Sequence, residues 1–293
     1  VEVPDERMVQ ISQYIKPKKQ IYNTIEFVDI AGLVRGASKG EGLGNQFLSH
    51  IRSVDAIIHV VRCFEDDNVT HVEGALDPIR DIEIIETELL IRDMESLDKK
   101  ITKVAKQART GDKDSIAEKE CLEYIIEKVN DGIQLRNIEL SENQQDIIKT
   151  LNLLTNKPIL YVANVDEKEI QSAERGLLAE KLFNYANENG CEAIRLCGNI
   201  EQEISTMPEE DRQMFLEEYN LPEPGLYKLI NRAYRLLGLE TYFTAGEKEV
   251  RAWTVKKNTT APGAAGVIHS DFERGFIKAE IYHFEDLMVH KSE

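Results

Sequence analysis

The sequence predicts an α/β fold whose parallel sheet is interrupted by an inserted helical hairpin. Apolar runs at 25–29, 56–64 and 157–164 have the length and composition of buried strands. Helical segments separate these runs, and strands that alternate with helices form parallel sheets. Between 90 and 129 the apolar residues take the spacing of a coiled-coil seam, which is typical of paired helices rather than of a sheet.

Composition limits the class of protein. A chain of 293 residues, 42% of them hydrophobic, has room for two or three modest domains with a substantial core. There is no long apolar run and no secretory signal at the start of the chain, so we expect a cytoplasmic protein with no membrane partner. The four cysteines include no C-x-x-C pair, which argues against a zinc site or a disulfide scaffold. The net charge of −17 argues against general DNA binding but leaves room for a local basic patch.

The first apolar run leads into a D-x-x-G motif that spans Asp29 to Gly32. In nucleotide-hydrolysing α/β proteins, the aspartate at such a strand end holds Mg²⁺, usually through water, because hard oxygens suit a hard cation. The glycine allows its backbone N–H to reach the γ-phosphate, since a side chain would block that approach. The motif alone is common, and a plain strand-to-helix turn is the alternative.

A glycine-rich loop follows the motif, and a helix is expected at 45–54. The loop begins at Leu33 and contains Gly36, Gly40, Gly42 and Gly44. A strand, a metal-type aspartate, a glycine-rich loop and a helix are together what a phosphate-sensing switch requires. We therefore interpret this stretch as a candidate switch loop.

The coiled-coil seam predicts an antiparallel helical hairpin that is broken at 110–114. Its apolar positions alternate spacings of four and three, and a helical face resumes after the break: Leu90, Met94, Leu97, Ile101, Val104, Ala108, then Leu122, Ile125 and Val129. Lys99, Lys103 and Lys106 recur at helical spacing away from this seam. They form either a solvated helix face, as charge runs usually do, or a basic surface that contacts nucleic-acid phosphates.

A polar sequence, Asn164 to Glu167, ends the run at 157–164. A helix at 173–189 and a strand at 192–197 are expected to follow it. Because ligands bind at the carboxyl ends of parallel strands, we expect Asn164 and Asp29 at the same edge of the sheet. A polar turn without a ligand is the alternative.

Four stretches together resemble one family of nucleotide hydrolases. They are DIAGLVRGASKGEGLGN at 29–45, HVVRCF at 59–64, NVDE at 164–167 and TYFTAGEKEVRAW at 241–253. The first resembles switch II of the Obg-like P-loop NTPases, and the set resembles the YchF/Obg-like ATPase subfamily over essentially the whole chain. The resemblance implies a parallel-sheet G domain, an inserted α-helical coiled coil and a C-terminal TGS domain of the β-grasp type. It also implies hydrolysis of ATP and association with the ribosome or its RNA.

The expected domains follow from this resemblance: a first part of the G domain at 1–80, the helical insertion at 81–140, a second part of the G domain at 141–238 and a TGS domain at 239–293. The family's phosphate-binding sequence, G-x-x-x-x-G-K-[ST], does not occur in the chain, and the TGS segment is shorter than the family leads one to expect. We therefore expect ATPase activity in a longer parent protein and an inactive chain when this segment stands alone.

Asn164, Val165 and Glu167 are the expected nucleotide-binding residues. Proteins that read guanine use N-K-x-D, in which the aspartate accepts two N–H donors of the base. Here Val165 replaces the lysine and Glu167 stands at the aspartate position, so we expect ATP to bind more tightly than GTP. A GTPase of the wider Obg class and a non-catalytic interaction module are the alternatives.

The catalytic group is a separate question, because Leu33 stands where Ras-like enzymes place the glutamine that positions the attacking water. Leucine has no polar atom for this role, so another group must act together with the Gly32 N–H. His71 follows a strand in a polar segment, and a histidine can exchange protons with water near neutral pH. A surface-loop histidine is the alternative, whereas His59 lies inside a strand and is expected in the core.

Overall fold

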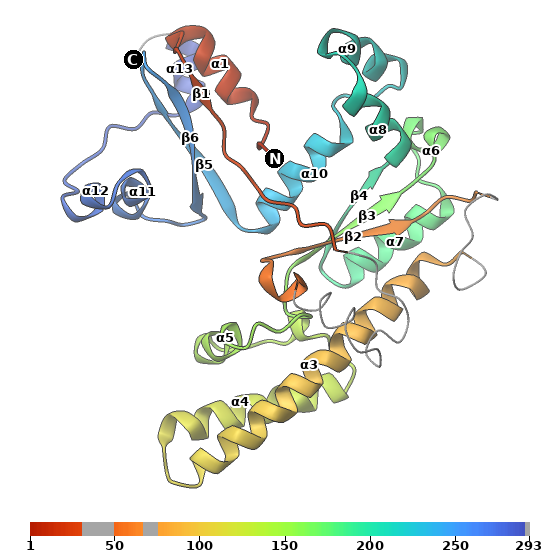
Figure 1. The fold of residues 1–293 in the computed structure, drawn as a ribbon, viewed down its shortest axis with the longest axis vertical. Coiled ribbons are helices and arrows are strands. Elements are labelled where there is room, and N and C mark those ends of the chain that lie inside the picture. Colours follow the sequence, from red (N-terminus) through yellow and green to blue (C-terminus); the bar gives the residue numbers. More distant parts are fainter. Residues whose placement is uncertain (31–49, 67–75, 291–293) are drawn as a thin grey trace. The chain divides into compact units, whose positions relative to one another are not determined.

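The computed structural model describes residues 1–30, 50–66 and 76–290. They belong to two compact units, one formed by Val28–Pro222 and the other by Val1–Phe27 with Glu223–Glu293 (Figure 1). The four predicted domains divide the chain more finely than these units do and stay predictions.

A three-stranded parallel sheet is the centre of the first unit. Its order is β2 (Ile57–Arg62), β3 (Ile159–Asn164) and β4 (Glu192–Leu196), which confirms the strands predicted at 56–64, 157–164 and 192–197. The register pairs Arg62 with Asn164 and Asn164 with Leu196, so the three carboxyl ends are level. The central strand β3 is buried along almost its whole length, as its apolar sequence requires. Strand β2 lies at an edge of the described sheet, and Val60 is 60% exposed there.

The shorter helices of this unit are α5 (Glu142–Lys149), α6 (Glu167–Gln171), α7 (Leu177–Glu188), α8 (Gly198–Thr206) and α9 (Glu209–Glu218), with the 3-10 turn η1 (Leu135–Asn137). Helix α7 packs on the sheet, whereas α5 and η1 pack in the apolar cluster of α3 and α4. The helix predicted at 173–189 begins later, at α7, because Gly176 is extended and serves as its N-cap. The Gly176 N–H donates to Glu169 Oε1 at 2.9 Å. A Cβ atom at this glycine would come within 2.4 Å of the same carboxylate, so a larger residue would have to displace the Glu169 side chain and lose this hydrogen bond.

The predicted helical hairpin is confirmed. It consists of α3 (Pro78–Ala108) and α4 (Lys113–Asn130), which run side by side in Figure 1. Asp77 caps α3, with Pro78 in the first turn, and the Asp112 carboxylate accepts the Ser115 N–H at the start of α4. The seam residues other than Ala108 belong to one cluster, in which Leu97, Val104, Leu122 and Ile125 are at most 1% exposed.

The strand predicted at 25–29 is wrong. Residues 25–30 have no strand pairing beyond one backbone hydrogen bond in each direction between Val1 and Ile25. Phe27 and Val28 are 39% and 41% exposed. An apolar run becomes a strand only when a neighbouring strand satisfies its backbone, and the described residues supply none here. Residues 50–53 are helical, but the rest of the helix predicted at 45–54 lies outside the described ranges.

The second unit contains a smaller sheet with the order β1 (Gln20–Ile21), β6 (Val250–Lys256), β5 (Leu239–Ala245). Strands β5 and β6 are antiparallel, and β1 pairs with β6 in parallel. The helices of this unit are α1 (Glu6–Ile15), α10 (Gly225–Leu236), α11 (Ala261–Ile268), α12 (Ser270–Arg274) and α13 (Phe284–His290). Met8 of α1 and Val250 of β6 are both fully buried in its core. In the ranges that the structure covers, no helix has the length and apolar character of a membrane span.

Candidate functional site

A pocket of about 340 Å³ lies where all three strands of the parallel sheet end. Its lining comes from the carboxyl end of each strand and the residues just after it: Phe64–Asp66 after β2, Asn164–Lys168 at the end of β3 and Cys197–Asn199 after β4. This edge is where open α/β sheets bind their ligands, because the loops that leave the strands diverge there. The pocket therefore coincides with the place at which the sequence predicts a site.

Asn164 is held in one orientation at the floor of the pocket. Its Oδ1 accepts the backbone N–H of Gly198, the first residue of α8, at 3.0 Å. The neighbouring Val165 N–H donates to Leu196 O at 2.8 Å, which extends the β3–β4 ladder by one bond. With Oδ1 engaged, the Asn164 amide presents its Nδ2 donors, which match an acceptor such as a purine N7.

The other two predicted binding residues differ in what they present. Val165 is 2% exposed and packs in the sheet core, so its side chain is not available to contact a base. Glu167 is exposed at the first position of α6. The carboxylate of Asp166, between them, accepts the Glu169 N–H at 2.8 Å and caps α6. Of the two carboxylates, Glu167 is thus the one without a local capping role.

The charge of the pocket lining indicates which part of a ligand could bind there. Glu65, Asp66, Asp166 and Glu167 line it together with one cation, Lys168. Four carboxylates against one ammonium disfavour an anion such as a phosphate group. The pocket therefore suits the uncharged, donor-bearing end of a ligand.

Two parts of the lining were missed by sequence reasoning, namely Phe64–Asp66 and Cys197–Asn199. The signal was available, because both segments directly follow predicted strands and the carboxyl-end rule applies to them as it does to Asn164. Arg62 shapes the first segment by donating to Phe64 O at 3.0 Å and to Asp66 O at 3.2 Å. Cys197 is buried, and burial raises the pKa of its thiol, so it is a packing residue rather than a nucleophile.

Asp29 is the one predicted metal ligand, and its side chain is exposed. Within the described ranges no group of three or more potential ligands is placed to hold a metal ion. The remaining predicted switch and catalytic residues lie outside the described residues: Gly32, Leu33, Gly36, Gly40, Gly42, Gly44 and His71. Their predicted roles stay predictions.

Lys99, Lys103 and Lys106 are exposed on α3, away from the seam that packs against α4. No described residue forms an ion pair with any of the three, whereas neighbouring Lys100 pairs with Glu118 of α4 at 2.7 Å. The three ammonium groups thus remain available to a partner.

His59, expected in the core, lies within β2 with its ring 5.9 Å from the Tyr161 ring. Its Nδ1 is buried and has no hydrogen-bond partner among the described residues. Burial lowers the pKa of His59 to about 4, so the ring is neutral at pH 7. It packs in the sheet and does not reach the pocket lining.

Comparison with known proteins gives matches over the whole chain. The family YchF-GTPase_C, described as "Protein of unknown function (DUF933)", matches residues 239–293, and MMR_HSR1, described as "50S ribosome-binding GTPase", matches 8–107. The Ribosome-binding ATPase YchF of Bacillus subtilis is 54% identical over 99% of this chain and 79% of its own. The protein of the same name from Escherichia coli O157:H7 is 46% identical over 100% and 80%. The solved structure of the Schizosaccharomyces pombe YchF GTPase superposes with a TM-score of 0.88 at 39% identity, covering 100% of this chain and 79% of that one.

Proposed function

Because the chain belongs to the YchF family, we propose that it binds ATP with Mg²⁺, hydrolyses it, and acts as a nucleotide-dependent switch on the ribosome in translation or stress response. The observation that carries the proposal is the pocket at the carboxyl end of the parallel sheet, into which Asn164 presents an amide donor. The cytoplasm, where ribosomes work, is the corresponding location.

Selection of the base is assigned to Asn164 and Glu167. The Asn164 Nδ2 donates to the purine N7 edge, which adenine and guanine share. Glu167 decides between them, because a longer carboxylate at the position of the guanine-reading aspartate is poorly placed for the two guanine N–H groups. A backbone carbonyl near Val165 would accept a hydrogen bond from the adenine amino group.

The phosphates and the metal belong to the D-x-x-G segment. Asp29 is exposed and has no hydrogen-bond donor among the described residues, so its carboxylate fits a hard cation. Mg²⁺ commonly takes only one or two protein carboxylates and completes its shell with water and phosphate oxygens. A single aspartate is therefore sufficient, and the ion would neutralise phosphate charge during hydrolysis. The Gly32 N–H and the switch loop, Leu33 with Gly36, Gly40, Gly42 and Gly44, would contact the γ-phosphate.

His71 is our candidate for positioning the attacking water, since Leu33 has no polar atom. In the full-length protein, His71→Ala should slow single-turnover hydrolysis by ~10²-fold or more while ATP affinity stays nearly constant. Equal single-turnover rates in the parent and the variant would make His71 a bystander. A backbone or partner-supplied group would then take its place.

The alternative function is GTP hydrolysis. It is favoured by the name of the S. pombe relative, a GTPase, whereas the bacterial relatives are named ATPases. A non-catalytic ribosome-binding module is the third reading. No comparison supports the expectation that this chain is inactive alone.

A competition titration of the full-length protein with ATP and GTP tests the proposal. ATP should bind more tightly, and Asn164→Asp should weaken both nucleotides by about tenfold, because a carboxylate still accepts the Gly198 N–H but cannot donate to N7. Asn184→Asp, on the exposed face of α7, makes the same charge change away from the pocket and should have no effect. Tighter binding of GTP would establish the alternative, and no binding of either nucleotide would leave the interaction module.

A further inference from the structure

Two stripes of residues on helix α3 contact other parts of the unit. One is apolar and faces α4, and the other mixes apolar with polar residues and does not face α4. The first is the seam from Leu90 to Ala108. The second stripe, which we define by its members, has spacings of four, three, four and three: Ile82, Glu86, Leu89, Asp93 and Ser96. Its members contact the sheet, α7 and the segments that lead into β2 and β3 rather than α4.

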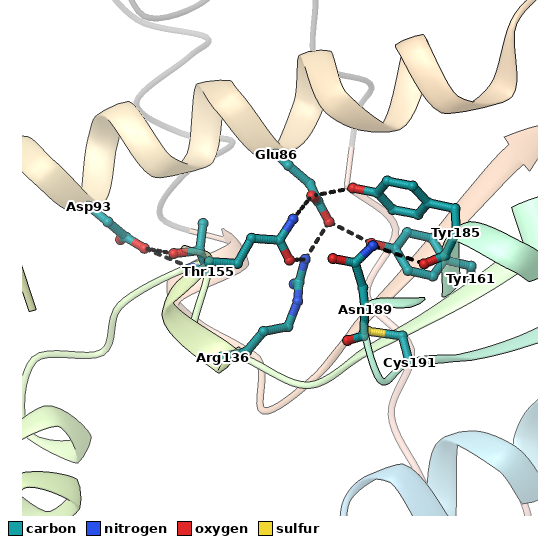
Figure 2. Close-up of polar contacts among 9 residues, drawn as sticks. Glu86, Asp93, Arg136, Thr155, Tyr161, Tyr185, Asn189 and Cys191 are labelled. Atoms are coloured by element: carbon teal, nitrogen blue, oxygen red, sulfur yellow. Dashed lines mark hydrogen bonds and ion pairs between the residues drawn. The ribbon is translucent and has the colours of Figure 1, made fainter. Parts of the chain in front are cut away.

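Glu86 joins the second stripe to the strand that ends in the pocket (Figure 2). Its carboxylate accepts the hydroxyl groups of Tyr161 in β3 and of Tyr185 in α7, the latter at 2.9 Å. It also accepts Gln134 Nε2 and pairs with the Arg136 guanidinium, both from the segment after α4. Burial raises the pKa of both tyrosines, so their hydroxyls remain donors at neutral pH. Tyr161 lies three residues before Asn164.

Asp93 fixes the same helix to the segment before β3. It is 1% exposed, and its two oxygens accept the N–H of Leu154 at 2.8 Å and the N–H and hydroxyl of Thr155 at 2.7 and 2.8 Å (Figure 2). Glu86, which is half-buried, has four donors, and buried Asp93 has three. Such groups are costly to disconnect, because removing a partner leaves a buried charge unsatisfied.

Ser96 joins α3 to the residues that follow the candidate switch loop. Its hydroxyl accepts Arg52 Nη2 at 3.0 Å. Lys157, just before β3, donates its ammonium to the carbonyls of Arg52 and Val54. Ile51 packs in the same cluster as Leu89 and Leu154. The chain that leaves the switch loop and the chain that enters β3 therefore both attach to the second stripe.

We propose that the second stripe of α3 is the joint through which a bound nucleotide changes the ribosome affinity of the hairpin. The inference rests on the proposed function and names its regulation. Helix α3 is continuous over 31 residues, so Glu86 and Lys106 are separated by roughly 30 Å along its axis. A tilt of about 10° at the joint would move the lysine-bearing end by about 5 Å over that length. Such a shift is enough to make or lose phosphate contacts.

The test is a thermodynamic cycle in the full-length protein. Ribosome affinity is measured with and without ATP·Mg²⁺, and ATP affinity is measured separately; the ratio of the two ribosome affinities is the coupling factor. Coupling factors in switch proteins are typically about 5 to 150. Two variants each remove one contact of the second stripe, and we call them the stripe variants. Tyr161→Phe removes the β3 hydroxyl that donates to Glu86, and Ser96→Ala removes the hydroxyl that accepts from Arg52.

The chain offers a matched control for each variant. Tyr124→Phe also removes a tyrosine hydroxyl. This hydroxyl belongs to α4, is exposed, and donates to Glu139 O at 3.5 Å, away from the second stripe. Thr102→Val also removes a hydroxyl of α3 that bonds the carbonyl four residues earlier, as Ser96 does, but it faces solvent. Both controls should keep the coupling factor of the parent.

The expected result is a coupling factor that falls towards 1 in Tyr161→Phe and Ser96→Ala, while ATP affinity and nucleotide-free ribosome affinity stay within about twofold of the parent. If these side chains only stabilised the fold, the variants would lower both the ATP affinity and the nucleotide-free ribosome affinity, and the coupling factor would stay that of the parent. The inference is overturned if both stripe variants retain the parent factor, or if the parent binds ATP and ribosome with a factor of 1, in which case the proposed function still stands. A parent that binds no nucleotide overturns both.

Discussion

Asn164 shows how one side chain acquires a functional orientation from a distant part of the chain. The residue ends a buried strand, but the Gly198 N–H, 34 positions later, holds its amide by Oδ1. The donor end is thereby directed to the pocket before any ligand arrives. Val165, by contrast, is committed to the core, so a lysine placed there would have to leave the sheet or bury its charge.

Glu167 carries the prediction on base selectivity. Glu167→Asp shortens the carboxylate towards the geometry that guanine needs, and the helix start at α6 should tolerate either acid. We expect the ratio of GTP to ATP affinity to rise by about tenfold, which corresponds to about 1.4 kcal/mol. Competition titrations with both nucleotides measure it, and Glu188→Asp at the exposed end of α7 serves as the control. A constant ratio would remove Glu167 from base selection.

His59 carries a prediction on pH. Its pKa is lowered to about 4 by burial, whereas an unfolded histidine titrates near 6.5. The unfolded chain therefore takes up a proton first, so the stability that His59 confers is complete above pH 6.5 and is lost as the pH falls towards 4.

The expected size is about 2 kcal/mol between pH 7 and pH 5. His59→Phe should remove that dependence, since the buried Nδ1 has no partner to lose among the described residues. Urea unfolding at the two pH values measures the difference, with exposed His283→Gln as the control. If parent and variant lose equal stability, His59 is not the titrating group.

Helix α3 illustrates how one element serves two packing partners. Its apolar seam faces α4, and its second stripe faces the sheet, which leaves the sector with Lys99, Lys103 and Lys106 exposed. These lysines lie off both stripes, so the fold does not require them. We therefore propose them as the contact to ribosomal RNA.

Replacing Lys99, Lys103 and Lys106 with Gln tests this surface. Each lost phosphate contact should reduce the slope of log affinity against log salt by roughly 0.7–0.9, hence by roughly 2–3 for the three. Thermal stability should change by less than ~0.5 kcal/mol, as for most surface substitutions. Ribosome co-sedimentation across a salt series gives the slope.

The control for the triple variant removes an equal charge elsewhere, at the exposed residues Lys149, Lys181 and Lys278. It should leave the slope close to that of the parent. Equal slopes in the parent and in the triple variant of Lys99, Lys103 and Lys106 would mean that these lysines form a solvated helix face.

At the scale of the whole molecule, the chain forms two units with separate cores. The core around β3 draws on Val28–Pro222, and the core around Met8 and Val250 joins the first residues of the chain to the last. The candidate pocket is lined entirely from the first of these units. Nucleotide should therefore stabilise one unit and not the other.

Calorimetry should accordingly resolve two unfolding transitions. At an ATP concentration of 100 times Kd, one transition should gain about 2.7 kcal/mol, or roughly 5–10 °C for a unit of this size. Leu182→Ala, in the sheet core, should lower the nucleotide-sensitive transition, and Val250→Ala should lower the other. A single transition that shifts as a whole would contradict this division.

The sequence by itself determined the features that depend on local pattern. Continuous apolar runs were sufficient for β2 and β3, because strands buried in a parallel sheet are apolar along their length. Apolar periodicity was sufficient for the α3–α4 hairpin, because burial of one helix face imposes its spacing on neighbouring residues. The position of Asn164 at the end of an expected parallel strand was sufficient to place it at a candidate site, because ligands bind at the carboxyl ends of such strands. Family resemblance supplied the nucleotide and the ribosome.

Tertiary structure decided what depends on partners distant in the chain. Residues 25–30 have the composition of a strand yet are not one among the described residues, because a strand exists only with a neighbour to satisfy its backbone. Glu86, Asp93 and Ser96 read as ordinary polar positions of a helix, and only the approach of Tyr161, Thr155 and Arg52 makes them a joint. Hydrogen bonds between residues 44 to 75 positions apart leave no periodic signal, so the sequence alone could not show them.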